Sequence, residues 1–431
     1  MSRQIGRRTL LRQAAFAGAS IWLCGRAVGA DAKSPNEKLD IAIIGPGGQG
    51  KTNLDNVAGE HIVAICDVDD KRAGDAYERF PKARKFHDYR RMFDRMESKI
   101  DAVVVSTPDH SHFHPSMMAM QRGKHLYCEK PLAHTVAEVR AMTELAAEKK
   151  VATQLGHQRH AYPNMHRVVE LIQSGAIGPV KECHAWVGGD RGMPAMPTDF
   201  PPVPAHLKWD LWVGPAPLRP YSPAYVPYGW RFWWDFGSGD IGNWGCHVLD
   251  IPFWALGLRY PTNVATSGPP LDAQRTPKSM DVRYVFPARG DHPPVTLHWS
   301  HTKMGPAILA EHKMPHFGTG VVFVGDQGML LCDFGKHKLY PEKKFADFQP
   351  PAPTIPESPG FYQEWILACK GGEPATCNFD YSGPLAETTV LANVAYRAGG
   401  AFAWDAAKLD APGRDEVRAL LRKTYRKGWD I

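Results

Sequence analysis

Short apolar runs separated by amphipathic stretches fill the first half of the chain. The runs at 39–44, 61–66, 102–106, 125–128 and 151–155 have the length and composition of buried strands. Apolar positions between them recur at helical spacing, most clearly over 136–149, and a further amphipathic helix is expected over 165–174. Because strands and helices alternate in this way, the pattern predicts an α/β architecture with a doubly wound parallel sheet.

The pattern changes after residue 180. Apolar and polar residues alternate over 180–187, 281–286, 295–301 and 320–324, which predicts a large, open and mainly antiparallel sheet. A Pro- and aromatic-rich insertion over roughly 189–236 interrupts this series, and helical periodicity returns from residue 361. The chain is therefore expected to form a parallel-sheet domain and then an α+β domain, whose last helices can pack back on the first.

A glycine-rich turn follows the first strand. The run Leu39-Asp-Ile-Ala-Ile-Ile44 continues directly into Gly45-Pro-Gly-Gly-Gln-Gly50, which has the pattern G-x-G-x-x-G. Glycines at these positions permit a tight turn, close approach of the backbone to a pyrophosphate and tight helix packing. The second strand leads to Asp67, at the distance expected for a carboxylate that binds a ribose. Together these features predict a dinucleotide-binding enzyme.

The first thirty residues carry a different signal. Gly6-Arg-Arg-Thr-Leu-Leu-Arg12 is a twin-arginine pattern, an Ala- and Gly-rich apolar run follows it, and Val28-Gly-Ala30 supplies small residues for cleavage. The apolar run is too short and interrupted for a stable membrane span. We expect a twin-arginine (Tat) signal peptide over 1–30, recognised by the Tat export machinery, and a periplasmic or otherwise extracytoplasmic protein. A disordered basic N-terminus is the alternative.

Charge and cysteine content narrow the function classes. The formal net charge is +6, but five arginines and no acid lie in the first thirty residues, so the remainder is near +1. Without a basic patch, no nucleic acid is expected as a partner. Seven of the eight cysteines follow residue 30, with no C-x-x-C among them. This odd number predicts mostly free, buried thiols, although Cys369 and Cys377 could pair.

Two further motifs follow predicted strands. Ser106-Thr-Pro-Asp-His-Ser-His112 follows the third run, and Cys128-Glu-Lys-Pro-Leu132 ends the fourth. With the glycine turn, they resemble the Gfo/Idh/MocA family of nicotinamide-dependent oxidoreductases, and the resemblance extends from Lys38 to the C-terminus. It implies an NAD(P)-binding Rossmann domain over 38–157, a substrate-binding and oligomerisation domain over 158–431, and a homodimer or homotetramer.

The resemblance also implies a cofactor site. It places the glycine turn at the pyrophosphate, Asp67 at the adenosine ribose, and Thr107, Pro108 and His112 beside the nicotinamide. A carboxylate at position 67 repels a 2′-phosphate, so NAD is favoured over NADP, although the nearby Arg72 moderates this preference. The residues expected to bind the cofactor are Gly45, Gly47, Gly48, Gln49, Gly50, Asp67, Thr107, Pro108, His112, Glu129 and Lys130.

Lys130, His247 and Asn243 are the catalytic candidates. By the resemblance, Lys130 lies between nicotinamide and substrate, where a partly desolvated ammonium can help to move the proton of a hydroxyl. The segment Gly237–His247 resembles one that normally carries D-x-x-x-H, and His247 matches the family's catalytic histidine. Asn243 replaces the aspartate. An amide cannot stabilise an imidazolium by charge, so the sequence does not decide which group is the principal base. Lys130 becomes a stronger candidate, and Asp240 or Asp235 are possible substitutes.

The aromatic residues of the insertion indicate the substrate. Aromatic faces stack on sugar rings, and Arg231 and Asp235 could bind hydroxyls, although about half of these aromatics are expected to form a loop core. The candidate substrate-binding residues are His157, Arg159, Tyr162, Arg231, Trp234, Asp235, Asn243 and His247. His110, His112 and His114 alternate, but no acidic or thiol cluster accompanies them, so no metal is expected.

These observations favour an exported NAD(P)-dependent oxidoreductase. It would transfer hydride between a ring carbinol of a sugar, cyclitol or glycoside and a tightly bound nicotinamide. Because free NAD is not expected outside the cytoplasm, a redox-assisted glycoside lyase or hydrolase that recycles bound NAD is an alternative. A non-catalytic sensor that binds NAD and sugar is a second alternative.

Overall fold

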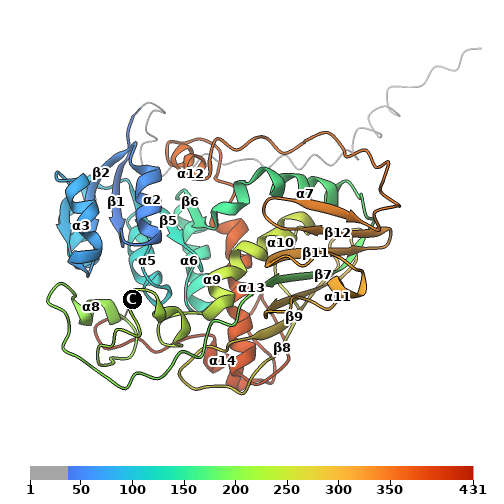
Figure 1. The fold of residues 1–431 in the computed structure, drawn as a ribbon. Helices are drawn as coiled ribbons and strands as arrows, with labels where there is room; N and C mark the ends of the chain where they lie inside the picture. Colours follow the sequence, from blue (N-terminus) through green and yellow to red (C-terminus); the bar gives the residue numbers. More distant parts are fainter. Residues whose placement is uncertain (1–36, 431) are drawn as a thin grey trace, which may run out of the picture.

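A computed structural model describes residues 37–430 of the chain (Figure 1). The predicted signal peptide, with its twin-arginine pattern and Cys24, lies outside these residues. Within the described range, no helix is long and apolar enough to cross a membrane.

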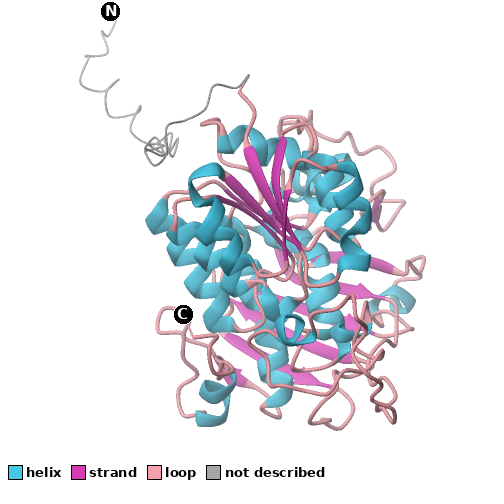
Figure 2. Cartoon of the chain, turned by 90° about the vertical axis from the view of Figure 1, so that its left-hand side faces the viewer, coloured by secondary structure: helices cyan, strands magenta, loops and turns pink. Residues whose placement is uncertain are grey.

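The first domain is a six-stranded parallel sheet with helices on both faces (Figure 2). Its strand order, β3-β2-β1-β4-β5-β6, confirms the doubly wound Rossmann arrangement. The strands are β1 (Asp40–Ile44), β2 (His61–Cys66), β3 (Arg84–Phe86), β4 (Ala102–Val105), β5 (His125–Glu129) and β6 (Thr153–Gly156). The helices are α2 (Gln49–Val57), α3 (Asp70–Arg79), α4 (Tyr89–Met96), η1 (Glu97–Lys99), η2 (Asp109–Ser111), α5 (Phe113–Gln121) and α6 (Val136–Lys149).

The direction of winding reverses between β1 and β4, because the chain continues from β1 to one side of the sheet and from β4 to the other. Ligands of such sheets bind at this reversal, beyond the carboxyl ends of the strands. All four residues of β4 and the last four of β1 are buried. The central strands are therefore a rigid base for the loops that follow them.

The second domain is an eight-stranded sheet with the order β13-β12-β11-β7-β10-β9-β8-β14. Only β7 and β10 pair in parallel and every other neighbouring pair is antiparallel, so the predicted mainly antiparallel sheet is confirmed. The strands are β7 (Val180–Val187), β8 (Asn263–Ser267), β9 (Met280–Phe286), β10 (Val295–His301), β11 (Thr319–Gly325), β12 (Gly328–Cys332), β13 (His337–Tyr340) and β14 (Phe402–Ala403).

Helix α13 (Phe379–Arg397) runs between the two sheets, in the middle of Figure 1. It is buried along almost its whole length, and its Glu387 pairs with Arg140 of α6 at 2.9 Å. Helix α12 (Phe361–Cys369) packs on α2 and adds Trp365 to the core beneath β1. The remaining helices are η3 (Gln158–Ala161), α7 (Pro163–Gln173), α8 (Trp209–Val213), η4 (Gly229–Phe232), α9 (Gly239–Val248), α10 (Asp250–Leu256), α11 (Ile308–Glu311) and α14 (Asp415–Leu420).

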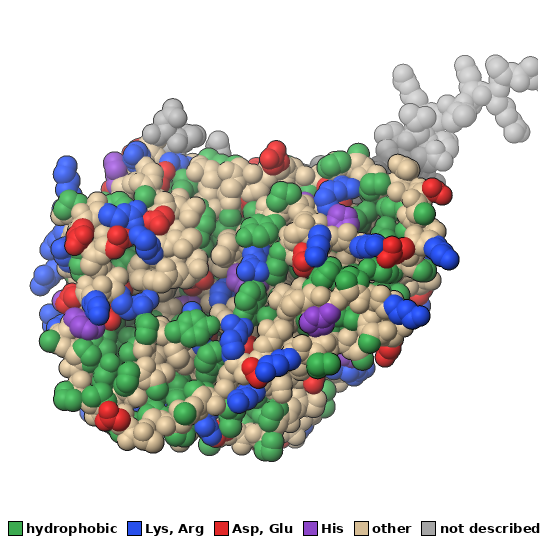
Figure 3. All heavy atoms as spheres, viewed as in Figure 1, with side chains coloured by type: hydrophobic (Ala, Val, Ile, Leu, Met, Phe, Trp, Pro, Cys, Tyr) green, Lys and Arg blue, Asp and Glu red, His purple; other side chains and the backbone are tan. Residues whose placement is uncertain are grey.

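The insertion between β7 and α9 lies below the first domain in Figure 1. It is tied to the loop after β2, because the Asp70 amide donates to the His206 carbonyl at 3.0 Å and the Lys208 amide to Val68 at 2.8 Å. It also exposes apolar side chains, with Leu218 63% exposed, and Figure 3 shows hydrophobic side chains gathered at its lower left. The C-terminal tail returns to this segment, where Arg426 donates to the Gly214 carbonyl at 2.9 Å.

The seven described cysteines are all free and buried, which confirms the prediction of mostly free, buried thiols. Cys369, the last residue of α12, and Cys377, in the loop before α13, both pack in the core under β1, but they do not form a disulfide.

Candidate active site

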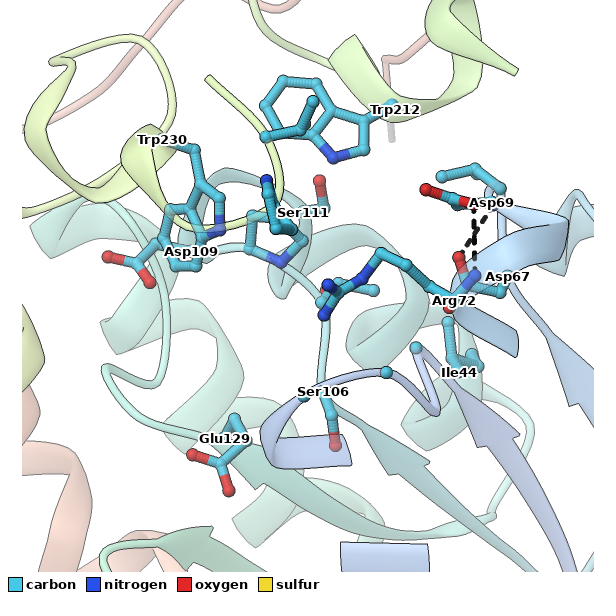
Figure 4. Close-up of a pocket in the computed structure, with 18 of the residues that line it drawn as sticks. Ile44, Asp67, Asp69, Arg72, Ser106, Asp109, Ser111, Glu129, Trp212 and Trp230 are labelled. Atoms are coloured by element: carbon cyan, nitrogen blue, oxygen red, sulfur yellow. Dashed lines mark hydrogen bonds between the residues drawn. The ribbon is translucent and has the colours of Figure 1, made fainter. Parts of the chain in front are cut away.

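A cavity of about 500 Å³ opens at the carboxyl ends of the central strands, between the first domain and the insertion (Figure 4). Its walls combine the glycine turn, the loops after β2, β4 and β5, helix α9, and the aromatic insertion. Of the predicted site residues, those that line it are Gly45, Gly47, Gly48, Gln49, Asp67, Thr107, Pro108, Glu129, Lys130, Arg231 and Asn243.

The turn between β1 and α2 is shaped for close approach of a ligand. Gly45 has a φ of +81°, and its amide donates to the Cys66 carbonyl at 2.9 Å. A Cβ at Gly50 would lie 1.8 Å from the Gly45 carbonyl oxygen, so only glycine lets α2 begin this close to the turn. Gly50 therefore does not line the cavity but allows α2 to pack closely against the turn. The N-terminus of α2 then favours binding of an anion such as a pyrophosphate.

Arg72 reaches from α3 to the glycine turn. A Cβ at Gly47 would lie only 2.9 Å from its Nε. Figure 4 shows this side chain extending across the cavity from the side that carries Asp67 and Asp69. The guanidinium therefore lies where a pyrophosphate would sit, which gives it a partner other than a 2′-phosphate.

Asp67 lies at the end of β2, on the side of the cavity suited to an adenosine ribose. Its Oδ1 accepts a hydrogen bond from the Asp69 amide at 2.9 Å. Burial raises the pKa of this carboxyl to about 7, and the neighbouring charge of Arg72 opposes the rise. The carboxylate is thus held in place with acceptor capacity left for two ribose hydroxyls.

A hydrogen-bonded network supports the opposite end of the cavity. Asn53 of α2 donates to Ser106 Oγ at 2.8 Å and to Glu129 Oε1 at 3.0 Å, and it accepts from Tyr362 Oη at 2.8 Å. Burial raises the pKa of Glu129. The buried Thr107 Oγ1 has no hydrogen-bond partner among the described residues, which leaves a polar atom for a ligand amide such as that of nicotinamide.

Lys130 and Asn243 meet where the two domains join. Lys130 follows β5, and α9 presents Asn243 to it: Lys130 Nζ donates to the Asn243 carbonyl oxygen at 2.9 Å and to Oδ1 at 3.1 Å. Burial lowers the pKa of Lys130, although the nearby Glu129 carboxylate opposes this effect. The structure therefore brings together two of the three predicted catalytic residues.

His247 lies one turn after Asn243 on α9, as its spacing predicts, but outside the cavity wall. Its ring is 7% exposed, and its Nδ1 has no hydrogen-bond partner among the described residues. Burial and the charge of Lys130 lower the pKa of His247 well below the ordinary value. The imidazole is therefore neutral at physiological pH.

Both carboxylates considered as substitute bases are held by arginines. Asp240 pairs with Arg191 at 2.7 Å, and Asp235 pairs with Arg219 at 2.5 Å. Neither lines the cavity. Among the groups considered, Lys130 is the one that lines the cavity, and the lowered pKa of its amino group favours proton exchange.

The aromatic insertion divides into a core and a cavity wall. Trp209, Tyr225 and Trp233 pack in the core of the insertion. Trp212, Trp230 and the half-exposed Tyr228 line the cavity. Arg231 covers the rings of Trp230 and Tyr228, with its guanidinium carbon 4.2 and 4.3 Å from their centroids. Trp212 and Trp230 belong to the same core, so more of these aromatics are structural than the expected half.

Several predicted residues lie elsewhere. His157 is fully buried behind the site, and Arg159 stacks over Trp244 and Phe334. Trp234 Nε1 donates to the Asp272 carbonyl at 3.0 Å, so this side chain packs against the second domain and does not line the cavity. Tyr162 precedes α7 with 43% of its surface exposed, also away from the cavity.

The three alternating histidines have separate structural partners. His112, predicted beside the nicotinamide, bonds the Thr107 and Pro131 carbonyls at 2.7 Å each. It therefore holds the Ser106–His112 and Cys128–Leu132 motifs together and does not line the cavity. His110 bonds the Phe236 and Trp212 carbonyls, and His114 bonds Trp429. These contacts anchor the insertion to the loop after β4 and the tail to the start of α5.

Two features of the site escaped the sequence prediction. Asp109 is buried and accepts from the Ser238 amide at 3.0 Å, which joins the β4 loop to the start of α9. Its position inside the Ser106–His112 motif could have indicated that Asp109 belongs to the site. Trp429 lines the cavity from the far end of the chain, and nothing in its local sequence indicates that position.

Comparison with known families agrees with this geometry. The model of the Gfo/Idh/MocA oxidoreductase family for its NAD-binding Rossmann fold matches residues 39–157, and the model for its C-terminal α/β domain matches 181–284. The chain belongs to the Gfo/Idh/MocA family of oxidoreductases, and its first domain is an NAD-binding Rossmann domain. The turn, Asp67 and Thr107 described above fit this cofactor.

Two curated relatives are dehydrogenases by name. An inositol 2-dehydrogenase of Rubrobacter xylanophilus is 31% identical over 160 residues, which are 36% of this chain and 45% of the relative. A levoglucosan dehydrogenase of Pseudarthrobacter phenanthrenivorans is 25% identical over 243 residues, 54% of each chain. The chain thus spans about half the length of these relatives.

Solved structures share the fold over a longer range. The WlbA dehydrogenase of Bordetella pertussis, solved with NADH and UDP-GlcNAcA, is 17% identical with a TM-score of 0.61. The match covers 86% of this chain and 99% of that one. It shows a common arrangement of both domains.

Proposed function

We propose that this protein is an NAD-dependent dehydrogenase that acts on a ring carbinol of a polyhydroxylated small molecule, a cyclitol or sugar. The observation that carries the proposal is the part-buried Lys130 amino group, which Asn243 holds in place in the wall of the nucleotide cavity. The names of the two dehydrogenase relatives, which refer to inositol and levoglucosan, support this class of substrate.

NAD is the hydride acceptor when it is bound, and Lys130 accepts the proton of the substrate hydroxyl. As a neutral amine, Lys130 directs both N–H bonds to the two oxygens of Asn243, and its lone pair faces the remaining direction. A carbinol placed there can pass its proton to Nζ as the hydride leaves its carbon. Burial favours the neutral amine by lowering the pKa of Lys130.

Asn243 favours Lys130 as the principal base. An aspartate at this position would hold the lysine charged, whereas the amide orients Nζ without adding negative charge. His247 is buried and neutral, and it lies one turn further along α9. We assign it to orienting the substrate or receiving the proton later.

The insertion supports a substrate with several hydroxyls. Tyr228 and Trp230 line the cavity, and Arg231, which stacks over both rings, adds guanidinium N–H donors to the same wall. Such a wall can hold a ring by its C–H face and orient one carbinol toward the cofactor, which lowers the barrier by positioning.

Replacement of Lys130 by Met tests the proposal. The assay uses myo-inositol and levoglucosan with NAD and follows NADH formation by absorbance. We expect the variant to lose about 10²–10⁴-fold in kcat, with an unchanged Kd for NAD. In Asn243→Asp, the acid limb of the pH profile should move to higher pH, because the added charge raises the pKa of Lys130. Lys130→Met turnover within about threefold of wild type would exclude Lys130 as the base.

The same preparation separates the alternatives. A p-nitrophenyl glycoside that releases nitrophenol without accumulation of NADH would indicate redox-assisted cleavage with recycled cofactor. Binding of NAD and polyol with neither reaction would indicate a sensor.

We also propose that the chain is exported by the twin-arginine route. The Arg7-Arg8 pair ahead of a short apolar run supports this, and so does a cofactor site suited to loading before export. Cell fractionation tests it: Arg7→Lys with Arg8→Lys should keep the protein in the cytoplasm. An unchanged distribution would refute export by this route.

A further inference from the structure

A cluster of metal-binding side chains lies behind the active site, away from the cavity. His157 and His160 come from the segment after β6, Asp250 begins α10, and Cys377 precedes α13. None of the four is more than 2% exposed. Ligand atoms of His157, His160 and Cys377 all lie within 4.8 Å of one another. Two distant segments of the chain therefore bring nitrogen and sulfur donors close together.

Asp250 adds an oxygen donor to this cluster. It lies 2.9 Å from His160 Nδ1 and 3.5 Å from His157 Nε2. Tyr381 Oη donates to its Oδ1 at 2.5 Å. The cluster thus holds a carboxylate in a fixed orientation.

His157 is the least satisfied member. Its ring is completely buried, and neither ring nitrogen has a hydrogen-bond partner among the described residues. Since buried polar groups are almost always paired, this imidazole calls for a partner beyond the long 3.5 Å contact of its Nε2 with Asp250. A metal ion between His157, His160 and Cys377 would be that partner.

We propose that His157, His160, Asp250 and Cys377 bind one Zn²⁺ ion. Imidazole and thiolate are the ligands that zinc prefers, and four protein donors form a closed, tetrahedral structural site. Donors of such a site lie roughly 3.3–3.6 Å apart, so shifts of the order of 1 Å would bring His157, His160 and Cys377 around the ion, and Asp250 would move with the two histidines that it contacts. The thiolate and carboxylate charges neutralise the ion.

The ion would fasten the junction of the two domains. It connects the end of β6 with α10 and with the loop before α13, and α10 directly follows the helix that carries Asn243 and His247. Structural zinc contributes directly to folding free energy. The site is thus a positioning device for the active site and not part of its chemistry.

The metal content of the tag-free, full-length protein tests the proposal. Mass spectrometry of the metals should find about one zinc per chain, and Cys377→Ser should remove most of it. Two control variants should retain it: Cys369→Ser, which changes another buried free thiol, and His298→Ala, which alters the half-buried Glu182–His184–His298 group.

Cobalt exchange gives an independent readout. Protein loaded with Co²⁺ should show a thiolate-to-cobalt charge-transfer band that is absent from Cys377→Ser. If that variant fails to fold, the wild-type spectrum decides. Wild type without zinc, and without the band after exposure to Co²⁺, would overturn the proposal, as would zinc that Cys377→Ser leaves in place. Because both readouts are independent of turnover, they do not depend on the proposed dehydrogenase activity.

Discussion

Single side chains determine what each end of the cavity can bind. Asp67 and Arg72 define the nucleotide end, whereas Lys130 and Asn243 define the reacting end. The sequence predicted Asp67, Lys130 and Asn243 because each lies at a fixed position in a motif, whereas Arg72 was expected only near a 2′-phosphate and its contact with the glycine turn was not predicted. It misplaced Trp234 and Asp235, because composition identifies aromatic and charged residues but not which face of an irregular loop they occupy.

Asp67 should make NAD binding dependent on pH. Its pKa is raised to about 7, so below that pH the cofactor-free protein holds a proton on this carboxyl. Ribose hydroxyls favour the ionised form, and binding therefore releases the proton. Affinity should rise with pH, by up to about tenfold per unit below pH 7, and become constant above it.

Titration calorimetry across pH 5–9 measures this effect. Asp67→Asn should abolish the pH dependence and weaken NAD binding by about 1.5–3 kcal/mol, the value of a hydrogen bond to a charged group. Asp94→Asn, at an exposed position of α4, is the control and should behave as wild type. A pH-independent affinity in wild type would contradict this role of Asp67.

Helices and strands were predictable where they are long and buried. The five strand predictions in the first domain match β1, β2, β4, β5 and β6 within two residues. Strand β3 was missed because it has three residues, of which only Phe86 is buried. In the second sheet, β8, β12, β13 and β14 were missed, since short strands near sheet edges carry little alternation.

The glycine turn predicts a contrast between two Gly→Ala variants. Gly50→Ala places a Cβ 1.8 Å from the Gly45 carbonyl oxygen and should destabilise the protein by about 1–3 kcal/mol, with weaker NAD binding. Gly74→Ala, inside α3 with no atom within 4 Å of the added Cβ, should stabilise it by about 0.4–1 kcal/mol.

Thermal unfolding with and without NAD compares these variants. If Gly50→Ala melts and binds NAD like wild type, the turn is less constrained than its geometry implies.

The molecule as a whole closes its nucleotide site with distant parts of the chain. The insertion is tied to the loop after β2 through His206, which also pairs with Asp69 at 2.9 Å. The C-terminal tail fastens the insertion in turn, since Arg426 donates to the Gly214 and Asp210 carbonyls at 2.9 and 2.8 Å. No local pattern in the sequence predicts these contacts, because they join segments separated by more than a hundred residues.

This closure implies slow release of the cofactor. Arg426→Ala removes the contacts of the tail with the insertion and should speed the dissociation of NAD, whereas Arg422→Ala, at an exposed position of the same tail, should not. Equal retention in both variants would show that the tail does not hold the site closed.

The central claim, that the cavity binds NAD as the redox cofactor and releases it slowly, is tested most directly on protein purified without added nucleotide. Denaturation followed by mass spectrometry identifies the nucleotide that is released. The structure predicts NAD or NADH at about one per chain in wild type, and much less in Arg426→Ala. Release of NADP would contradict the role of Asp67, and an empty wild-type protein would contradict a tightly held cofactor.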